Sequence, residues 1–424
     1  MNITIYPALV SGEIYSPASK SYTQRAVAIS SLVKGESTIT NFGLCNDTSA
    51  AMGVAKNLGV ELSLNDRTLT VKGGELKLED KVLNIGESGL STRLFTPFAS
   101  LLSYPVTITG HGSILTRPID MMLQPLTELG VKISSNKGKL PIELCGVMSG
   151  GEISIDGSLS SQFLTGLLIS LPVCAKDSII NVNQLRSKPY IDMTLAIIET
   201  FGVTIINENY ERFIIKGNQQ YKPTVYNIEG DWSGASCLLV AGATMGNVTM
   251  NNLSYESQQA DKEIITAIKD AGATVIINEN SVTVEKNELK GFTFDATECP
   301  DLFPALVALA AACKGETVLK GTSRLTHKES DRAKTLKDIY ETLGISVDIS
   351  KEDLMVITGC DIKGGVTLNS HNDHRIAMSA AVATLRASAA NIITDAECVN
   401  KSYNDFYKDL KIITNNQLIT KDEI

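Results

Sequence analysis

The chain has 424 residues, of which 43% are hydrophobic and 20% are charged, and its formal net charge is -9. This length and composition fit two globular domains of about 200 residues each and exclude a disordered protein. The negative net charge disfavours a nucleic acid or an anionic membrane as the main partner, although local cations can still bind a small anion.

The eight cysteines are scattered and include no C-x-x-C pair, so we predict buried, reduced thiols rather than a disulfide framework. The N-terminal sequence MNITIYPALVSG has no basic patch followed by an apolar stretch, which would mark a signal peptide. The longest apolar stretch, residues 302–313, is shorter than the roughly 20 residues of a membrane helix. We therefore expect a cytoplasmic protein without a membrane partner.

A sequence motif of two parts recurs along the chain. Its first part is an amphipathic helix that ends at a glycine before a β-branched strand. These glycines lie 70 to 72 residues apart and are Gly59, Gly130, Gly202, Gly272 and Gly344. Glycine suits this place because helices often end in a left-handed residue.

The second part is an apolar helix that opens with small or acidic polar residues and leads into a short strand. Six copies begin near Ser21, Ser88, Ser160, Ser233, Asp301 and Asp373. Each opening combines capping side chains with backbone N–H groups that suit anions. Six units of about 70 residues predict an α/β chain of two domains, each built from three repeats.

The last repeat has no convincing strand after its helix at residues 404–413, whereas residues 2–7 form a strand without a preceding helix. We interpret the N-terminal strand as the part that completes the last repeat. One domain is then discontinuous, with residues 1–19 plus 231–424, and residues 20–230 are inserted into it. The alternative is a frayed C-terminus and an unrelated first strand.

The first apolar helix opens with a candidate anion site. Lys20 and Ser21 stand at its start and Arg25 follows one turn inside. The two cations and the helix N-terminus would attract an anion in the same direction. The alternative is a solvated lysine.

Two further sequence motifs of the inserted domain are also candidate ligand sites. GESGLSTR, residues 86–93, opens a helix at which Gly89 would allow close approach of the backbone to a ligand. Arg117 precedes Pro118, which we expect to begin a helix and so to fix the direction of the arginine. Helix capping by Ser88 and a surface arginine are the alternatives.

Consecutive polar residues open the third apolar helix at Ser160, Ser161 and Gln162, with Ser187 and Tyr190 one connection later. Capping requires only one such side chain, so the others indicate a polyhydroxylated or phosphorylated ligand.

Candidate acids and bases stand in the second half of the chain. Asp301 opens a very apolar helix and could be an N-cap or a general base. The run RLTHKESDR supplies Arg324, Lys328, Glu329, Asp331 and Arg332, although a charged run is usually a solvated face. His374 and Arg375 stand at the last apolar helix, and Lys401 precedes the final one.

Six sequence motifs follow one another along the chain: PASKS-x3-R, SSQ, SKPY, PD, KESDR and NDHR. Together they look like the signature set of the EPSP synthase family. The resemblance covers essentially the whole chain. It implies two domains of three βαβαββ-type repeats each, arranged as an inside-out α/β barrel or prism, with substrates bound as the domains close. It implies neither a metal nor a cofactor.

The implied reaction transfers the enolpyruvyl group of phosphoenolpyruvate to the 5-hydroxyl of shikimate 3-phosphate and releases phosphate. We expect Asp301 to be the base, and Glu329 with Lys20 to supply the proton. The residues expected to bind shikimate 3-phosphate are Lys20, Ser21, Arg25, Ser160, Ser161, Gln162, Ser187, Tyr190, Asp301 and Lys328. Those expected to bind phosphoenolpyruvate are Lys20, Gly89, Arg117, Gln162, Arg332, Arg375 and Lys401. The expected oligomeric state is a monomer.

The chain departs from the family pattern at two places. Glu87 and Leu90 stand where the family usually has Asn and Thr, which predicts weaker binding of phosphoenolpyruvate and of the inhibitor glyphosate. We expect Glu87 to turn outward or to pair with a base such as Arg93. Thr326 and His327 replace the more usual Arg-Val, most simply as surface residues.

The sequence is also compatible with two rival functions. The UDP-N-acetylglucosamine enolpyruvyl transferases share the repeats and the donor, but they typically have Lys-Asn at the positions of Lys20 and Ser21. They also have a cysteine in the loop that here reads GHGSILTRP. A non-catalytic repeat scaffold would explain the period, but not the polar clusters at six helix openings.

Overall fold

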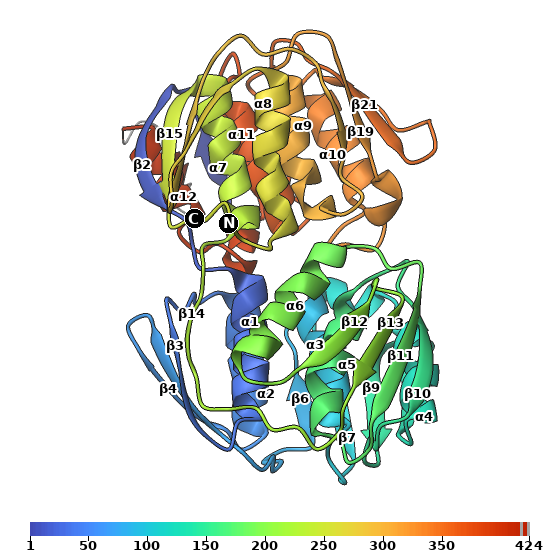
Figure 1. Cartoon of the computed structure of the whole chain (residues 1–424). Helices are drawn as coiled ribbons and strands as arrows, with labels where there is room; N and C mark the ends of the chain where they lie inside the picture. Colours follow the sequence, from blue (N-terminus) through green and yellow to red (C-terminus); the bar gives the residue numbers. More distant parts are fainter. Residues whose placement is uncertain (416–418, 422–424) are drawn as a thin grey trace. The chain divides into compact units, whose positions relative to one another are not determined.

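The computed structural model describes residues 1–415 and 419–421. The chain divides into two compact units (Figure 1). Unit 1 comprises Met1–Ser19 and Glu229–Ile424, and unit 2 comprises Lys20–Ile228. The sequence placed the end of the inserted segment at residue 230, two residues further along.

Unit 2 contains three βαβαββ-type repeats, the first of which takes its opening strand from the end of the unit. The first is α1 (Lys20–Ser31), β3 (Gly35–Thr40), α2 (Asn46–Asn57), β4 (Glu61–Asn65) and β5 (Thr68–Gly73), joined by β14 (Val225–Asn227). The second is β6 (Val82–Asn84), α3 (Gly89–Ala99), β7 (Val106–Thr109), α4 (Leu123–Glu128), β8 (Lys132–Asn136) and β9 (Lys139–Cys145). The third is β10 (Glu152–Asp156), α5 (Gln162–Ser170), β11 (Ser178–Asn183), α6 (Lys188–Thr200), β12 (Ile205–Glu208) and β13 (Arg212–Ile215).

Unit 1 repeats the plan. Its first repeat is β2 (Val10–Tyr15), α7 (Trp232–Met245), β15 (Gly246–Asn251), α8 (Ile264–Ala271), β16 (Thr274–Ile277) and β17 (Ser281–Glu285). The next is β18 (Thr293–Asp295), α9 (Phe303–Ala311), β19 (Glu316–Lys320), α10 (Arg332–Thr342), β20 (Ser346–Asp348) and β21 (Leu354–Thr358). The last is β22 (Thr367–Asn369), α11 (His374–Thr384), β23 (Asn391–Thr394), α12 (Phe406–Ile413), β24 (Ile419–Lys421) and β1 (Ile3–Ile5).

Each repeat forms one four-stranded sheet with a constant strand order. In the second repeat the order is β6-β7-β9-β8, where β6 and β7 are parallel and the other neighbours antiparallel. The parallel pair is connected through a helix, as a parallel crossover requires. The same order recurs in the third repeat as β10-β11-β13-β12. The six-repeat α/β architecture predicted from the sequence is confirmed.

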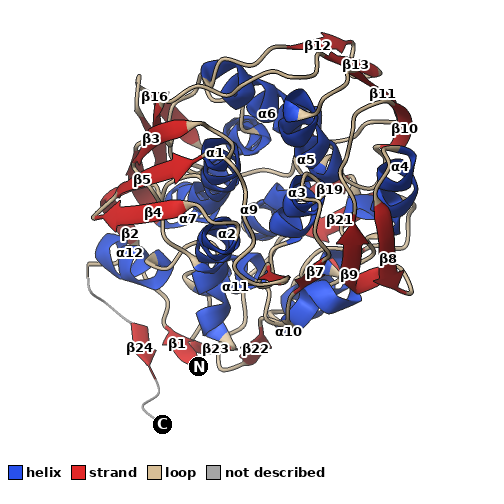
Figure 2. Cartoon of the chain, turned by 90° about the horizontal axis from the view of Figure 1, so that it is seen from below, coloured by secondary structure: helices blue, strands red, loops and turns tan. Residues whose placement is uncertain are grey.

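The helices divide into an inner and an outer set, with the sheets at the periphery in the view of Figure 2. All residues of α3, α9 and α11 are buried, whereas only part of each outer helix is. A helix that is buried on all sides is enclosed by the rest of its unit, so these inner helices form the cores of their units. This is the inside-out arrangement that the sequence resemblance implied.

The five helix-ending glycines behave as predicted. Their φ angles lie between 81° and 106°, in the left-handed region that a side chain disfavours. Each therefore turns the chain from an outer helix into the following strand.

The last sheet differs from the sequence-based expectation in one respect. Its order is β22-β23-β1-β24, so β1 does join the last repeat, paired antiparallel with both β23 and β24. The expectation of no strand after α12 was wrong, because β24 pairs with β1 at the edge of the sheet. Three residues are too short to show a strand periodicity in the sequence.

The structure contains no disulfide among its eight cysteines. Six are buried as predicted, but Cys145 is only partly buried and Cys360 is exposed, so the expectation of burial was wrong for these two.

Within the described residues, no helix has the length and apolarity that a membrane crossing demands. The same residues contain no group of three or more His, Cys, Asp or Glu side chains that could hold a metal ion.

Candidate active site

Seven charged side chains gather in unit 1 where α9, α10 and α11 begin. We call them the Asp301 cluster; its members are Asp301, Lys328, Glu329, Arg332, Asp373, Arg375 and Lys401. The sequence singled out six of these as site residues, and the fold brings them together from four separate segments. Four cations among these seven face three carboxylates, so the cluster suits an anionic ligand.

Asp301 lies in a 3-10 helix, Pro300–Leu302, immediately before α9. One carboxylate oxygen is 3.0 Å from Lys328 Nζ and 2.9 Å from Arg332 Nη1, and the other is 3.4 Å from Arg375 Nη2. Burial alone would raise the pKa of Asp301, but the charges of Lys328, Arg375 and Arg332 outweigh burial and hold this pKa well below its usual range. Asp301 is therefore ionised at neutral pH.

Arg332 is the centre of the cluster and is only 1% exposed. Its Nε and Nη2 donate to the two oxygens of Asp373, at 2.8 and 3.2 Å, and its Nη2 also donates to Glu329 at 2.6 Å. Burial lowers the pKa of Arg332, but the charges of Asp373, Glu329 and Asp301 raise it by more. The guanidinium thus stays charged and is held in one orientation by bidentate pairing.

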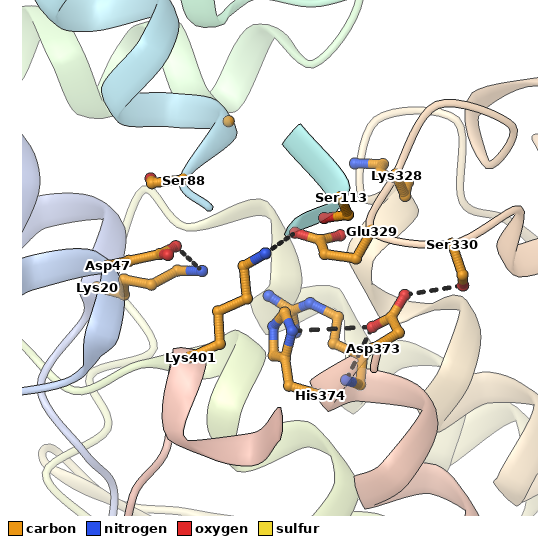
Figure 3. Close-up of polar contacts among 12 residues, drawn as sticks. Lys20, Asp47, Ser88, Ser113, Lys328, Glu329, Ser330, Asp373, His374 and Lys401 are labelled. Carbon is orange, nitrogen blue, oxygen red and sulfur yellow. Dashed lines mark hydrogen bonds and ion pairs between the residues drawn. The ribbon is translucent and has the colours of Figure 1, made fainter. Parts of the chain in front are cut away.

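Asp373 is a site residue that sequence reasoning missed, because an acidic residue before a helix is explained by capping alone. Its side chain does cap α11, accepting from Arg375 N at 3.1 Å. It also accepts from Ser330 Oγ at 3.1 Å (Figure 3) and is fully buried. Aspartate is rarely fully buried unless it is paired, and here its partner is Arg332.

Lys401 ends a 3-10 helix, Ala396–Lys401, and is only 5% exposed. Its Nζ lies 3.9 Å from Glu329 Oε1 (Figure 3). Glu329 is therefore held between a lysine and Arg332, which fixes its carboxylate. His374, the first residue of α11, is also buried, with Nδ1 3.8 Å from Asp373 Oδ1.

In unit 2, Lys20 is the first residue of α1 and pairs with Asp47 at 2.8 Å (Figure 3). Asp47 lies in the first turn of α2 and is 4% exposed. Nothing in the sequence around Asp47 distinguishes it from an ordinary acidic residue of a first helical turn, so its contact with Lys20 was not predicted.

Arg25 is 1% exposed and joins α1 to α5 and α6. Its Nε donates to Thr194 at 2.9 Å, its Nη1 to Ser21 O at 2.9 Å, and its Nη2 to Thr165 and Tyr190 O. These bonds use four of the five N–H donors of the guanidinium. Burial lowers the pKa of Arg25 to about 10. Arg25 thus positions the neighbouring polar residues as well as being a candidate ligand contact.

The third helix opening is as polar as predicted. Ser160 Oγ accepts from Gln162 N at 3.2 Å, which provides the capping contact, and Ser161 is 4% exposed beside it. Ser187 precedes α6 with φ of 59°, a left-handed conformation that is uncommon for a residue other than glycine. Such backbone strain is often found at ligand sites. The carbonyl of Tyr190 accepts from Arg25 Nη2 at 3.2 Å.

The second helix opening brings Arg117 against Gly89. A β-carbon added at Gly89 would lie 2.7 Å from Arg117 Nη1, so the guanidinium packs directly on this glycine and a side chain there would displace it. Ser88 caps α3 by accepting from Ser91 N at 3.1 Å. The expectation that Pro118 begins a helix was wrong. Arg117 follows a 3-10 helix, Gly112–Thr116, and the next begins at Asp120.

The remaining departure from the family pattern lies at the surface. Thr326 and His327 are both exposed, as expected. Arg324 donates to Thr297 O at 3.2 Å and so helps to hold the segment that leads to Asp301.

Solved structures define the class of fold to which these two units belong. An EPSP synthase from Acinetobacter baumannii superposes with a TM-score of 0.83 at 25% identity, covering 99% of both chains. The enolpyruvyl transferase NikO from Streptomyces tendae has a TM-score of 0.79 at 15% identity and covers 99% of this chain and 98% of its own. The latter similarity shows the fold alone, which is that of the enolpyruvyl transferases.

Sequence comparison is more specific. Residues 6–410 match the model of the family described as EPSP synthase (3-phosphoshikimate 1-carboxyvinyltransferase). A protein of that name from Clostridium perfringens is 38% identical over 413 residues, which are 96% of this chain and 97% of that protein. Another from Clostridium novyi is 37% identical over 421 residues, 97% of each chain. The chain belongs to the EPSP synthase family.

Proposed function

We propose that the chain transfers the enolpyruvyl group of phosphoenolpyruvate to the 5-hydroxyl of shikimate 3-phosphate, within the shikimate pathway of aromatic amino acid biosynthesis. The observation that carries this proposal is the Asp301 cluster, where two carboxylates suited to proton transfer are held by four cations in a chain of this family. The polar helix openings of unit 2 are suited to a phosphorylated alcohol, which supports the acceptor.

The reaction has two proton transfers. The 5-hydroxyl adds to C2 of phosphoenolpyruvate while C3 is protonated to a methyl group; C3 then loses a proton as the C2–O bond to phosphate breaks. We assign Glu329, assisted by Lys20, as the donor to C3 and Asp301 as the base for the hydroxyl. Asp301 has a low pKa in the structure, so it is a weak base while Lys328, Arg332 and Arg375 face it. A bound phosphate would share these cations and raise the basicity of Asp301.

We assign the remaining expected residues to the two substrates unit by unit. In unit 1, Arg332, Arg375 and Lys401 would bind phosphoenolpyruvate, because arginine suits bidentate contacts with carboxylate and phosphate. In unit 2, Lys20, Gly89, Arg117 and Gln162 would contact the same donor. The proposed contacts of shikimate 3-phosphate are Lys20, Ser21, Arg25, Ser160, Ser161, Gln162, Ser187, Tyr190, Asp301 and Lys328.

The acceptor distinguishes this proposal from its nearest rival. Phosphate release from phosphoenolpyruvate should be measured with shikimate 3-phosphate and, separately, with UDP-N-acetylglucosamine. We expect a kcat/KM at least about a hundredfold higher with shikimate 3-phosphate, since a site that binds a phosphorylated alcohol through buried polar groups rejects an acceptor that leaves them unpaired. A preference for UDP-N-acetylglucosamine would refute the acceptor.

We also propose that the protein is a cytoplasmic monomer. Its net charge of -9 disfavours nucleic acid as a partner.

A further inference from the structure

Two segments of unit 2 lie side by side in matching order: residues 86–93, which open α3, and residues 110–118, which follow β7. His111 N donates to Gly86 O at 3.1 Å. Further along, Arg93 donates through Nη1 to Gly89 O at 3.2 Å and through Nη2 to Pro118 O at 3.0 Å. The first segment is thus attached to both ends of the second.

Between these attachments, Glu87 lies against Gly112. Gly112 begins the 3-10 helix with φ of 64°, and a β-carbon built on it would overlap the Glu87 carboxylate at Oε1. The carboxylate of Glu87 therefore occupies the space above this turn. The sequence anticipated that Glu87 would turn outward or pair with a base; it did not anticipate packing on the turn.

Arg117 stands at the other end of the same short helix. Its Nη1 and Cζ would lie 2.7 and 2.9 Å from a β-carbon at Gly89, so the guanidinium rests directly on the backbone there. Arg117 is 8% exposed, and Ile114, between Gly112 and Arg117, is fully buried. One short 3-10 helix thus connects Gly112, against which Glu87 packs, to Arg117, which packs on Gly89. A shift at one end of this helix would move the other end.

We propose that Glu87 is a positioning residue that holds the turn at Gly112 and thereby keeps Arg117 on Gly89, where the donor phosphoenolpyruvate binds. This inference rests on the proposed function, because Arg117 is a proposed donor contact. It reverses the expectation from charge alone: a carboxylate near an anionic donor should weaken binding, whereas a carboxylate that orients an arginine strengthens it.

Steady-state kinetics distinguish repulsion of the donor by Glu87 from orientation of Arg117 by Glu87. In Glu87→Ala the KM for phosphoenolpyruvate should rise about tenfold, while kcat and the KM for shikimate 3-phosphate change by less than about twofold, because the arginine is displaced and the acceptor contacts are not. Glu36→Ala is the matched control, since it removes the same charge from an exposed position of unit 2. An unchanged or lowered KM for phosphoenolpyruvate in Glu87→Ala would overturn the proposal.

Gly112→Ala is a second variant that keeps the charge of Glu87. Its methyl group would displace the carboxylate and strain the backbone at a φ of 64°, so the KM for phosphoenolpyruvate should rise as in Glu87→Ala, whereas charge repulsion alone predicts no such change. A wild-type KM in this variant would count against the positioning role.

Limited chymotrypsin digestion tests the turn without any substrate. Leu115 is 42% exposed and is the chymotrypsin site on this helix, so cleavage is followed at this bond by mass spectrometry. Cleavage there should be faster in Glu87→Ala than in wild type and Glu36→Ala, and equal rates in all three would overturn the proposal. If the wild type turns over no phosphoenolpyruvate with shikimate 3-phosphate, the proposed function fails, but the digestion still decides whether Glu87 holds the turn.

Discussion

Substitution of Asp373 tests the packing of charges in the Asp301 cluster most severely. Asp373→Ala removes both oxygens that Arg332 holds at 2.8 and 3.2 Å and removes the cap of α11. Arg332 is 1% exposed, so water cannot replace the lost acceptor, and two of its four hydrogen bonds in the structure disappear.

The expected cost follows from these contacts. Removing one partner of a buried ion pair destabilises a protein by about 3–5 kcal/mol, and removal of an N-cap adds about 1 kcal/mol. Glu329 and Asp301 still face Arg332, so we expect the lower part of the range, about 4 kcal/mol. This is a large share of the roughly 5–15 kcal/mol by which a typical domain is stable. Asp373→Asn keeps a capping side chain and should lose about 1 kcal/mol less.

Urea unfolding followed by tryptophan fluorescence is the assay, because the only tryptophan, Trp232, is fully buried in α7 of the same unit. At a slope of about 2–3 kcal/mol per M, the midpoint should fall by roughly 1.3–2 M in Asp373→Ala. Ser330→Ala is the matched control, since it removes one hydrogen bond to Asp373 and should cost about 1 kcal/mol. Equal midpoints for Asp373→Ala and Ser330→Ala would refute the assigned role of Asp373.

Three further predictions concern the proposed chemistry and the folding of the units. Asp301→Asn and Glu329→Gln should each lose about a hundredfold or more in kcat, as for a positioned acid or base, and near-normal turnover would remove either from the mechanism. Burial raises the pKa of Glu229, which accepts a 2.6 Å hydrogen bond from Gln259, so its folded pKa exceeds the unfolded one. The Tm of the wild type minus that of Glu229→Gln should therefore fall as the pH rises from about 4.5. A Tm difference that does not change with pH would contradict this. A fragment of residues 20–228 should unfold cooperatively by circular dichroism, whereas residues 229–424 lack β1 and β2 and should not; a cooperative second fragment would contradict the shared sheets.

The repeat architecture could be predicted because it rests on local, periodic signals. Helix-ending glycines recur every 70 to 72 residues, and each needs a left-handed conformation that few residues other than glycine adopt. β1 was recognisable as a strand without a helix before it. β24 was not, because three residues of an edge strand carry no periodicity.

The candidate site was only partly predictable, because its charges are paired across long sequence separations. Asp373 could be recognised as a cap from its place before a helix, but its pairing with Arg332, 41 residues away, depends on how α10 and α11 pack. Asp47 and Lys20 are similarly joined only by the packing of α1 on α2. The effect of Glu87 was predicted from its charge, whereas its position over Gly112 depends on a turn that the sequence does not reveal.

The most direct test of the account is the stoichiometry of the reaction, followed by proton and phosphorus NMR on the purified enzyme with phosphoenolpyruvate and shikimate 3-phosphate. Enolpyruvyl transfer predicts one new vinyl ether, with its two methylene protons, for each inorganic phosphate released, and no pyruvate. Release of phosphate together with pyruvate and unchanged shikimate 3-phosphate would show a phosphatase instead. Either that result or the absence of reaction would contradict the proposed function.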